Sequence, residues 1–288
     1  DTLIGGAGKD IMIGGSGDDS YSVDNVSDVV TEDANADTDL VSSSVSYLLP
    51  INVENLTLTG TAALNGTGNG LANVMVGNAA NNQLNGGSGA DTLIGGRGND
   101  SYIIDNANDM VTERLNEGID IVSSSVTYTL SANVENLTLI GTTAINANGN
   151  GLANNLKGNT AANRLTGGGG NDTLDGGTGK NILTGGTGKD IFKLTTTGHI
   201  DSITDFVVID DTIQLENAAY TKLTTTGTLV AGQFRIGSKA LDANDFVIYN
   251  NATGALLYDA DGNGAVAAVQ IATIGVGLAM TNADIVVI

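Results

Sequence analysis

The chain has 288 residues and a formal net charge of −21 at pH 7, from 11 Lys and Arg against 32 Asp and Glu. This charge excludes nucleic-acid binding as a serious function, argues against an anionic membrane surface, and opposes compaction unless counter-ions neutralise it. Glycine accounts for 41 residues, Trp and Cys are absent, and aromatic residues make up 4%. This composition favours a solenoid with a thin apolar stripe over a conventional core, and we expect neither a transmembrane helix nor an N-terminal signal peptide.

The chain opens on Asp1–Ile4, the tail of a nonapeptide unit whose glycines are missing, so we expect the chain to be a piece of a longer protein. Two complete units follow at residues 5–13 (GGAGKDIMI) and 14–22 (GGSGDDSYS). Both fit the template G-G-x-G-x-D-x-U-x, in which U is a large apolar residue. Residues 23–31 keep the same register more weakly, with Asp28 at the sixth position.

Each unit divides into a loop and a strand. Glycines at positions 1, 2 and 4 permit a tight turn that exposes several carbonyl oxygens. Positions 7 to 9 are extended, and because side chains alternate across a strand, position 8 points to one side and positions 7 and 9 to the other. Two units form one coil with strands on two faces. The repeat therefore predicts an all-β fold, a right-handed parallel β-roll or β-solenoid with calcium in its turns.

The pattern changes after residue 31. The spacing slips, with Asp39 as the next expected loop residue, and residues 40–67 have the character of longer strands. The nonapeptide frame then returns over residues 68–85, where Asn73 and Asn82 replace the Asp of the sixth position. These substitutions predict loops that carry oxygen ligands without charge.

Complete units at residues 86–94 and 95–103 reveal a second, longer period. The paired glycines at positions 5, 86 and 167 are equally spaced (86 − 5 = 81; 167 − 86 = 81). The segment 23–85 likewise recurs as 104–166. Because this interval equals nine nonapeptides, the inserts predict more coils of the same solenoid. The slip leaves open whether each block holds eight or nine half-coils, and nine would place equivalent loops on opposite faces.

Three successive units occupy Gly167–Lys193 (GGGGNDTLD, GGTGKNILT, GGTGKDIFK). Calcium needs about 6–8 oxygen ligands, more than one such loop supplies. Stacked coils bring alternate loops within about 4.8 Å of each other, so two loops can share one ion. A good site then needs Asp at position 6 of units one coil apart, and Asp172 with Asp190 meets this condition, while Asn181 lies in the loop between them.

The same rule predicts further calcium sites. The paired carboxylates are Asp10 with Asp28, Asp91 with Asp109, Asp100 with Asp120, and, weakened by the incomplete first unit, Asp1 with Asp19. The loop residues expected to complete these sites are Gly5, Ala7, Gly14, Ser16, Gly86, Ser88, Gly95, Arg97, Gly167, Gly169, Gly176, Thr178, Gly185 and Thr187. Loops around Asn73, Asn82, Asn154 and Asn163 are expected to form neutral, calcium-free Asn ladders.

Residues 1–193 resemble the calcium-binding parallel β-roll of RTX (repeats-in-toxin) proteins, of which this nonapeptide is a signature. Residues 194–288 resemble the C-terminal region of that family: residues 201–217 are similar to the segment that follows the roll in secreted RTX proteases, and residues 245–264 to its last strands. The end of the chain, Asp284–Ile288, looks like the uncleaved signal of type I secretion, the alternative being an ordinary terminal strand. The resemblance implies a β-roll followed by a C-terminal β cap, in a secreted or cell-surface protein.

Two other features are candidates for chemistry. Residues 259–264 (DADGNG) match the start of an EF-hand loop, with Gln270 where the bidentate Glu belongs. Their flanks have strand character, so we expect no EF-hand, which leaves a small calcium loop or a β-turn. The single histidine, His199, is predicted at the surface. Cysteine, H-E-x-x-H and G-x-S-x-G are absent from the sequence, and calcium accounts for the carboxylates, so we predict no catalysis in this chain.

We therefore predict a calcium-binding module that stays unfolded and exportable where calcium is scarce and folds where it is abundant, outside the cell. Its predicted partners are calcium and the type I secretion machinery. Two alternatives stay open. One is an adhesive or surface-layer protein that binds cell-surface glycans or self-assembles. The other is the non-catalytic tail of a secreted protease, lipase or polysaccharide-modifying enzyme whose catalytic domain lies upstream.

Overall fold

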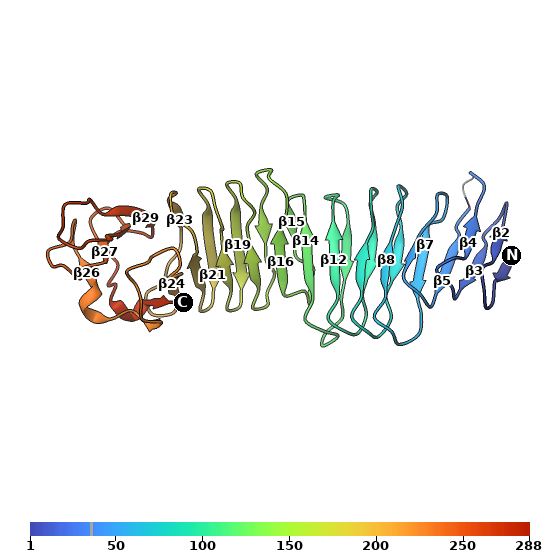
Figure 1. Ribbon diagram of the computed structural model, residues 1–288, viewed down its shortest axis with the longest axis horizontal. Coiled ribbons are helices and arrows are strands. Elements are labelled where there is room, and N and C mark those ends of the chain that lie inside the picture. Colours follow the sequence, from blue (N-terminus) through green and yellow to red (C-terminus); the bar gives the residue numbers. More distant parts are fainter. Residues whose placement is uncertain (35–36) are drawn as a thin grey trace. The chain divides into compact units, whose positions relative to one another are not determined.

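The structure is a computed structural model that describes residues 1–34 and 37–288 (Figure 1). It divides into two compact units, Asp1–Asn136 and Leu137–Ile288, called unit 1 and unit 2 below. In both units short parallel strands stack into coils, which confirms the predicted all-β solenoid. Over the described residues the only helical elements are two single turns of 3-10 helix, η1 (Ala231–Gln233) and η2 (Asn282–Asp284).

Unit 1 has strands on two faces, and each strand pairs in parallel with the strand one coil away. The first face comprises β1 (Thr2–Ile4), β3 (Ser20–Val23), β5 (Leu40–Ser43), β7 (Asn55–Leu58), β9 (Val74–Val76), β11 (Thr92–Ile94) and β13 (Met110–Thr112). The second comprises β2 (Ile11–Ile13) with β4 (Val29–Thr31), then β6 (Tyr47–Leu48), β8 (Asn65–Thr67), β10 (Gln83–Asn85), β12 (Ser101–Ile104) and β14 (Ile121–Ser124). Two more strands, β15 (Tyr128–Thr129) and β16 (Asn136–Leu139), follow.

Position 8 of the nonapeptide forms the core, as the side-chain alternation predicts. Leu84, Leu93 and Tyr102 are completely buried, while their flanking residues are more exposed, as in the exposed–buried–exposed pattern of β2. Burying one such side chain stabilises the fold by about 1.5–3 kcal/mol. The thin stripe of position-8 residues between two faces explains how a chain with 4% aromatic residues forms a continuous interior.

Each block, from one pair of repeated glycines to the next, contains nine half-coils. The strands β3 and β12 are equivalent in sequence, because Ser20 and Ser101 hold the same place in successive blocks. Yet β3 lies in the sheet of the first face and β12 in that of the second, and the same holds for β5 and β14. Because nine is odd, equivalent loops alternate between faces, which resolves the question that the sequence left open.

The slip after residue 31 is absorbed in the loops. In a regular coil Gln83 pairs with Ser101, whereas Ser20 pairs with Leu40 and Leu40 pairs with Asn55. The first of these two steps is longer than a regular coil and the second is shorter. The strands keep their parallel register on either side of both steps. The two irregular coils therefore lengthen one loop and shorten the next without breaking the stack.

Unit 2 continues the same architecture and ends in a region with antiparallel strands. One sheet comprises β18 (Asn155–Lys157), β20 (Thr173–Asp175), β22 (Ile191–Leu194), β24 (Thr212–Leu215) and β30 (Ile285–Val287), with β25 (Gly227–Thr228) antiparallel at its edge. The other comprises β17 (Ala147–Asn148), β19 (Arg164–Gly169), β21 (Ile182–Thr187), β23 (Asp201–Ile203), β29 (Val269–Thr273), β28 (Ala255–Tyr258), β27 (Val247–Asn250) and β26 (Phe234–Ile236).

Parallel pairing therefore extends beyond Lys193, through β23 and β24 to β29 and β30. The last strand, β30, buries Ile285 and Val287 against the end of the coil stack. Antiparallel strands cover the sheet edges at this end, where open edges would otherwise present unpaired backbone groups. This arrangement agrees with the expected C-terminal β cap.

Candidate metal sites

The sixth residues of the nonapeptides form hydrogen-bonded ladders along the stacked loops. In unit 2, Asp190 Oδ1 accepts from the backbone N–H of Asp172 at 2.9 Å, and Asp172 Oδ1 accepts from that of Asn154 at 2.7 Å. Each side chain thus reaches back one coil and fixes the preceding loop. The equivalent bonds in unit 1 join Asp28 to Asp10, Asp39 to Asp19, Asp109 to Asp91 and Asp120 to Asp100.

These bonds use one oxygen of each carboxylate, and in many of the loops the other oxygen is buried without a hydrogen-bond partner. A buried carboxylate oxygen is costly unless a proton, a donor or a cation satisfies it. Among the aspartates that accept a ladder bond, such an oxygen belongs to Asp91, Asp100, Asp120 and Asp172. Buried oxygens without a hydrogen-bond partner also belong to Asp10, Asp19 and Glu113, although the Asp1 amino group lies close to Asp19. The loops therefore fit calcium, a hard cation that takes carboxylate and carbonyl oxygens.

Glycine is required in these loops for two separate reasons. At position 1 the need is space: a Cβ on Gly86 or Gly167 would overlap the carboxylate of Asp91 or Asp172 in the same loop. At positions 2 and 4 it is backbone conformation, with φ of +107° at Gly168 and positive values in the other complete units. The side chains at position 3 are exposed, and that of Thr178 donates from Oγ1 to the Thr160 carbonyl at 3.2 Å. The exposed residues are Ala7, Ser16, Ser88, Arg97, Thr178 and Thr187, whereas Gly169 is half-buried.

In loops with Asn at position 6, the side-chain amide finds its hydrogen-bond acceptors within the protein. Asn82 Nδ2 donates to the carbonyl of Leu64 at 2.9 Å, and Asn163 Nδ2 donates to that of Ile145 at 2.7 Å. The amide group thus donates to loop carbonyls that a cation would otherwise contact. The ladder bonds of these loops run from backbone N–H to side-chain oxygen and not between carboxamides.

Burial changes the acidity of the ladder carboxyls. It raises the pKa of four of them from an ordinary 3.8 to about 6, with neighbouring carboxylates adding to the effect and backbone hydrogen bonds opposing it. Burial likewise raises the pKa of Glu113 to about 7, against a hydrogen bond from Tyr102 that lowers it. The four aspartates are Asp91, Asp100, Asp120 and Asp172. Without a cation, these carboxyls therefore retain their protons to a higher pH than an ordinary aspartate does.

The structure brings together all four predicted main pairs, with the ladder bonds between 2.7 and 3.1 Å. The fifth pair differs, because the Asp1 side chain is exposed and its amino group lies 2.5 Å from Asp19 Oδ1. Asn181 holds the sixth position of its unit but adds no carboxylate to the ladder. Its Nδ2 donates a hydrogen bond to Asp201 Oδ1 at 3.1 Å. The loops 167–172 and 185–190 are also joined directly, as Gly170 N–H donates to the Thr187 carbonyl.

The ladders contain several acidic residues that were not predicted from the sequence. Glu54 and Glu135 occupy the ladder position below Asp39 and Asp120, with Oε2 accepting from each backbone N–H at 2.9 Å. Both glutamates hold the same place in successive blocks of the sequence, and this recurrence could have revealed them. The remaining ones are Glu32 and Glu113, beside the Asp pairs, and Asp201, Asp205 and Asp211, which continue the ladders past Lys193.

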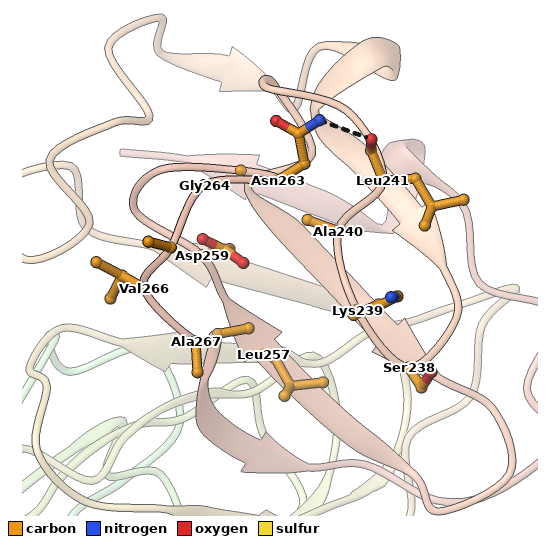
Figure 2. A pocket seen from close by; sticks show the side chains of 13 residues that line it. Ser238, Lys239, Ala240, Leu241, Leu257, Asp259, Asn263, Gly264, Val266 and Ala267 are labelled. Carbon is orange, nitrogen blue, oxygen red and sulfur yellow. Dashed lines mark hydrogen bonds between the residues drawn. The ribbon is translucent and has the colours of Figure 1, made fainter.

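The Asp259–Gly264 loop has the hydrogen bonding of a turn. Asp259 Oδ1 accepts from Asp261 N–H at 3.2 Å, an Asx turn, and the flanking elements are the antiparallel strands β28 and β29, so the expectation of no EF-hand is confirmed. Gln270 donates to Ala272 and Thr273. Figure 2 shows the cavity of about 520 Å³ beside this loop, with Asn263 hydrogen-bonded to the Leu241 carbonyl at 3.0 Å.

The prediction that His199 lies at the surface is wrong. Its side chain is only 10% exposed, and Nε2 lies 3.2 Å from Thr196 Oγ1 and 3.6 Å from Asp201 Oδ2. The loop between β22 and β23 that carries His199 is itself held through Thr196, whose Oγ1 donates to the Gly177 carbonyl at 2.8 Å. His199 therefore neighbours the ladder carboxylate Asp201.

Comparison with known proteins agrees with this geometry. The family model of the RTX calcium-binding nonapeptide repeat matches in four copies, at residues 1–30, 67–102, 148–183 and 157–192. The chain carries RTX calcium-binding repeats. The matched stretches contain the complete RTX nonapeptides and the Asn-lined coils next to them, so the repeat solenoid is a structural calcium-binding domain.

Among solved structures, the chain is similar to the extracellular lipase LipA from Serratia marcescens. The two share 16% sequence identity with a TM-score of 0.24, over 87% of this chain and 45% of the lipase chain. The chain thus spans less than half of the length of the lipase. No match was found among curated proteins. Within the residues that the structure describes, no helix is long and apolar enough to cross a membrane.

Proposed function

We propose that this chain is a calcium-dependent folding module of a larger secreted protein, exported by a type I system. The observation that carries the proposal is the set of buried ladder aspartates, such as Asp100, Asp120 and Asp172, in which one oxygen makes a ladder bond and the other is left without a hydrogen-bond partner. Without cations these charges repel one another and oppose folding; with calcium they become ligands. Since a ligand that binds only the native state stabilises it, calcium binding and folding are one equilibrium.

The residues that hold the ions are the paired aspartates together with the loop carbonyls. Calcium affinities of extracellular modules are about 10⁻⁴–10⁻³ M, far above the free calcium of a cytosol. The module therefore stays unfolded before export and folds outside the cell. The region after Lys193 covers the last coil, and the activity of the whole protein resides in segments other than this one.

A calcium titration followed by circular dichroism tests the proposal. In chelator at about pH 7.5 we expect little β-structure, and a cooperative gain of β-signal at about 10⁻⁴–10⁻³ M calcium. Magnesium at the same concentration should not replace calcium, because it retains its waters and demands octahedral geometry. A complete β-spectrum in chelator, with a melting temperature that calcium does not raise, would contradict the proposal.

Individual sites can be tested by replacing one ladder aspartate. Asp172→Asn removes the charge and the unpartnered Oδ2 while keeping the oxygen that accepts from Asn154, so we expect about one fewer bound calcium by equilibrium dialysis. The matched control is Asp175→Asn, the same charge change on a strand position whose Oδ1 accepts from Gly177 N–H and Thr195 Oγ1. An unchanged calcium count for Asp172→Asn would remove this residue from the site.

A further inference from the structure

Two ladder positions differ from the others by holding three carboxylates in place of two. At the first, Asp100, Glu113 and Asp120 each place one oxygen within 4.8 Å of the others. All three residues are buried, with exposures of 1%, 6% and 1%. Among the described residues, no ion pair from Lys, Arg or His reaches any of them.

Each carboxylate is held through one oxygen and presents the other. Asp100 Oδ1 accepts from Asn82 N–H at 2.6 Å, and Asp120 Oδ1 accepts from Asp100 N–H at 2.7 Å. Glu113 Oε1 accepts from the hydroxyl of Tyr102, which lies in β12 just after Asp100. The remaining oxygens, Asp100 Oδ2, Glu113 Oε2 and Asp120 Oδ2, are buried and have no hydrogen-bond partner.

This spacing suits one cation. Calcium–oxygen distances are about 2.3–2.6 Å, so two ligands of the same ion lie at most about 5 Å apart. The loop geometry supports the fit, because a Cβ on Gly95 would overlap the Tyr102 hydroxyl, Asp100 Oδ2 and Glu113 Oε1. The absence of a side chain at Gly95 thus makes room for Asp100, Glu113 and the Tyr102 hydroxyl to come together.

The cluster occurs twice. Asp19, Glu32 and Asp39 form the corresponding group, in which Tyr21 donates to Glu32 Oε1. Here Gly15 N–H donates to Glu32 Oε2 at 3.2 Å, and the amino group of Asp1 lies 2.5 Å from Asp19 Oδ1. Every member of this group holds the place of its counterpart in the preceding block. The simpler Asp pairs lack the third acid: the residue at the place of Glu113 is Gly185 in the Asp172–Asp190 pair. A tyrosine-held glutamate is therefore a distinct feature of two loops and not a property of the repeat.

We propose that these two clusters are cation sites of higher affinity than the two-aspartate loops, and that they fill first as calcium rises. The inference rests on the proposed calcium function and adds an order of binding to it. A third carboxylate supplies both a further ligand and a further negative charge, and the number of charged ligands is a main determinant of calcium affinity. Early occupancy would tie together the loops of β12 and β14 before the remaining coils close.

Terbium(III) luminescence tests the order, because terbium takes the same oxygen ligands and tyrosine within a few ångströms sensitises its emission. The chain has seven Tyr and no Trp. In the full chain we expect the first increments of terbium to emit through Tyr21 and Tyr102. The double variant Tyr21→Phe/Tyr102→Phe should lose this first phase, whereas Tyr258→Phe, in the cap, should retain it.

The double variant Glu32→Gln/Glu113→Gln should shift the first phase to about tenfold higher terbium, since ligand charge sets the affinity. Glu117→Gln is the matched control in the same loop, and its Oε1 lies 3.8 Å from Arg114. A first phase unmoved by the glutamate variants would overturn this inference alone, provided that calcium still folds the chain. Absence of terbium binding together with absence of calcium-induced folding would overturn the proposed function as well.

Discussion

In calcium-free buffer, acid is expected to replace calcium and stabilise the fold. Burial raises the pKa of the ladder carboxyls, such as Asp91 and Asp172, from 3.8 to about 6. The folded state thus binds protons more tightly than the unfolded state between these two values, so the free energy of unfolding falls as the pH rises through this window and levels off above it. The loss at neutral pH is roughly 1–3 kcal/mol for each such group.

Thermal melts at about pH 4.5 and pH 7.5, with chelator and with calcium, measure this effect. With chelator, the melting temperature should be higher at the acidic pH; with saturating calcium the order should reverse, because the ion binds the charged form and competes with protons. At about pH 6, calcium binding should release about half a proton for each carboxyl whose pKa is near 6, and almost none at about pH 8. A calcium-free chain that is more stable at the higher pH than at the lower would contradict the buried, unpaired state of these carboxylates.

The second large effect is expected from Gly186→Ala. Gly186 has φ of +103°, a conformation that an L side chain rarely adopts, and a Cβ there would overlap the backbone of Gly168, its neighbour in the adjacent coil. Relief requires the two stacked loops to separate, and both are held by ladder bonds. We expect a loss of more than about 3 kcal/mol, visible as a lower melting temperature in calcium.

Gly6→Ala is the matched control, because Gly6 occupies the same second position of its nonapeptide. Its φ is +80°, yet nothing lies within 4 Å of an added Cβ. Only the conformational penalty applies, about 1–2 kcal/mol. Equal losses for the two variants would show that φ alone, and not the close approach of stacked loops, makes glycine necessary.

The local features of this protein could be predicted from its sequence because they repeat with every nonapeptide. The glycine template predicts the loop, the apolar eighth position predicts the buried side of each strand, and both are found at Leu93 and Leu174. The pairing of Asp91 with Asp109 and of Asp172 with Asp190 also follows from spacing, since stacking places every second nonapeptide next to the first. A regular solenoid converts sequence period directly into distance.

Other features depend on where the period is broken. The coils on either side of β5 are irregular, one long and one short, so only the observed strand pairing shows that a block contains nine half-coils and that equivalent loops alternate between faces. Glu54 enters the ladder in the place of Asp for the same reason. The burial of His199 contradicts its predicted surface position, because its contacts with Thr196 and Asp201 lie outside the nonapeptide frame and have no periodic signal.

The sequence by itself therefore determined the class of fold and predicted which loops carry paired carboxylates and which carry Asn in their place. The tertiary structure decided which carboxylates lie together. The convergence of Asp100, Glu113 and Asp120 joins residues from different coils and requires the Tyr102 hydroxyl to orient the glutamate. The sequence of one nonapeptide determines which ligand atoms its loop offers. The number of carboxylates that come together depends on which loops the stacking of coils brings next to each other.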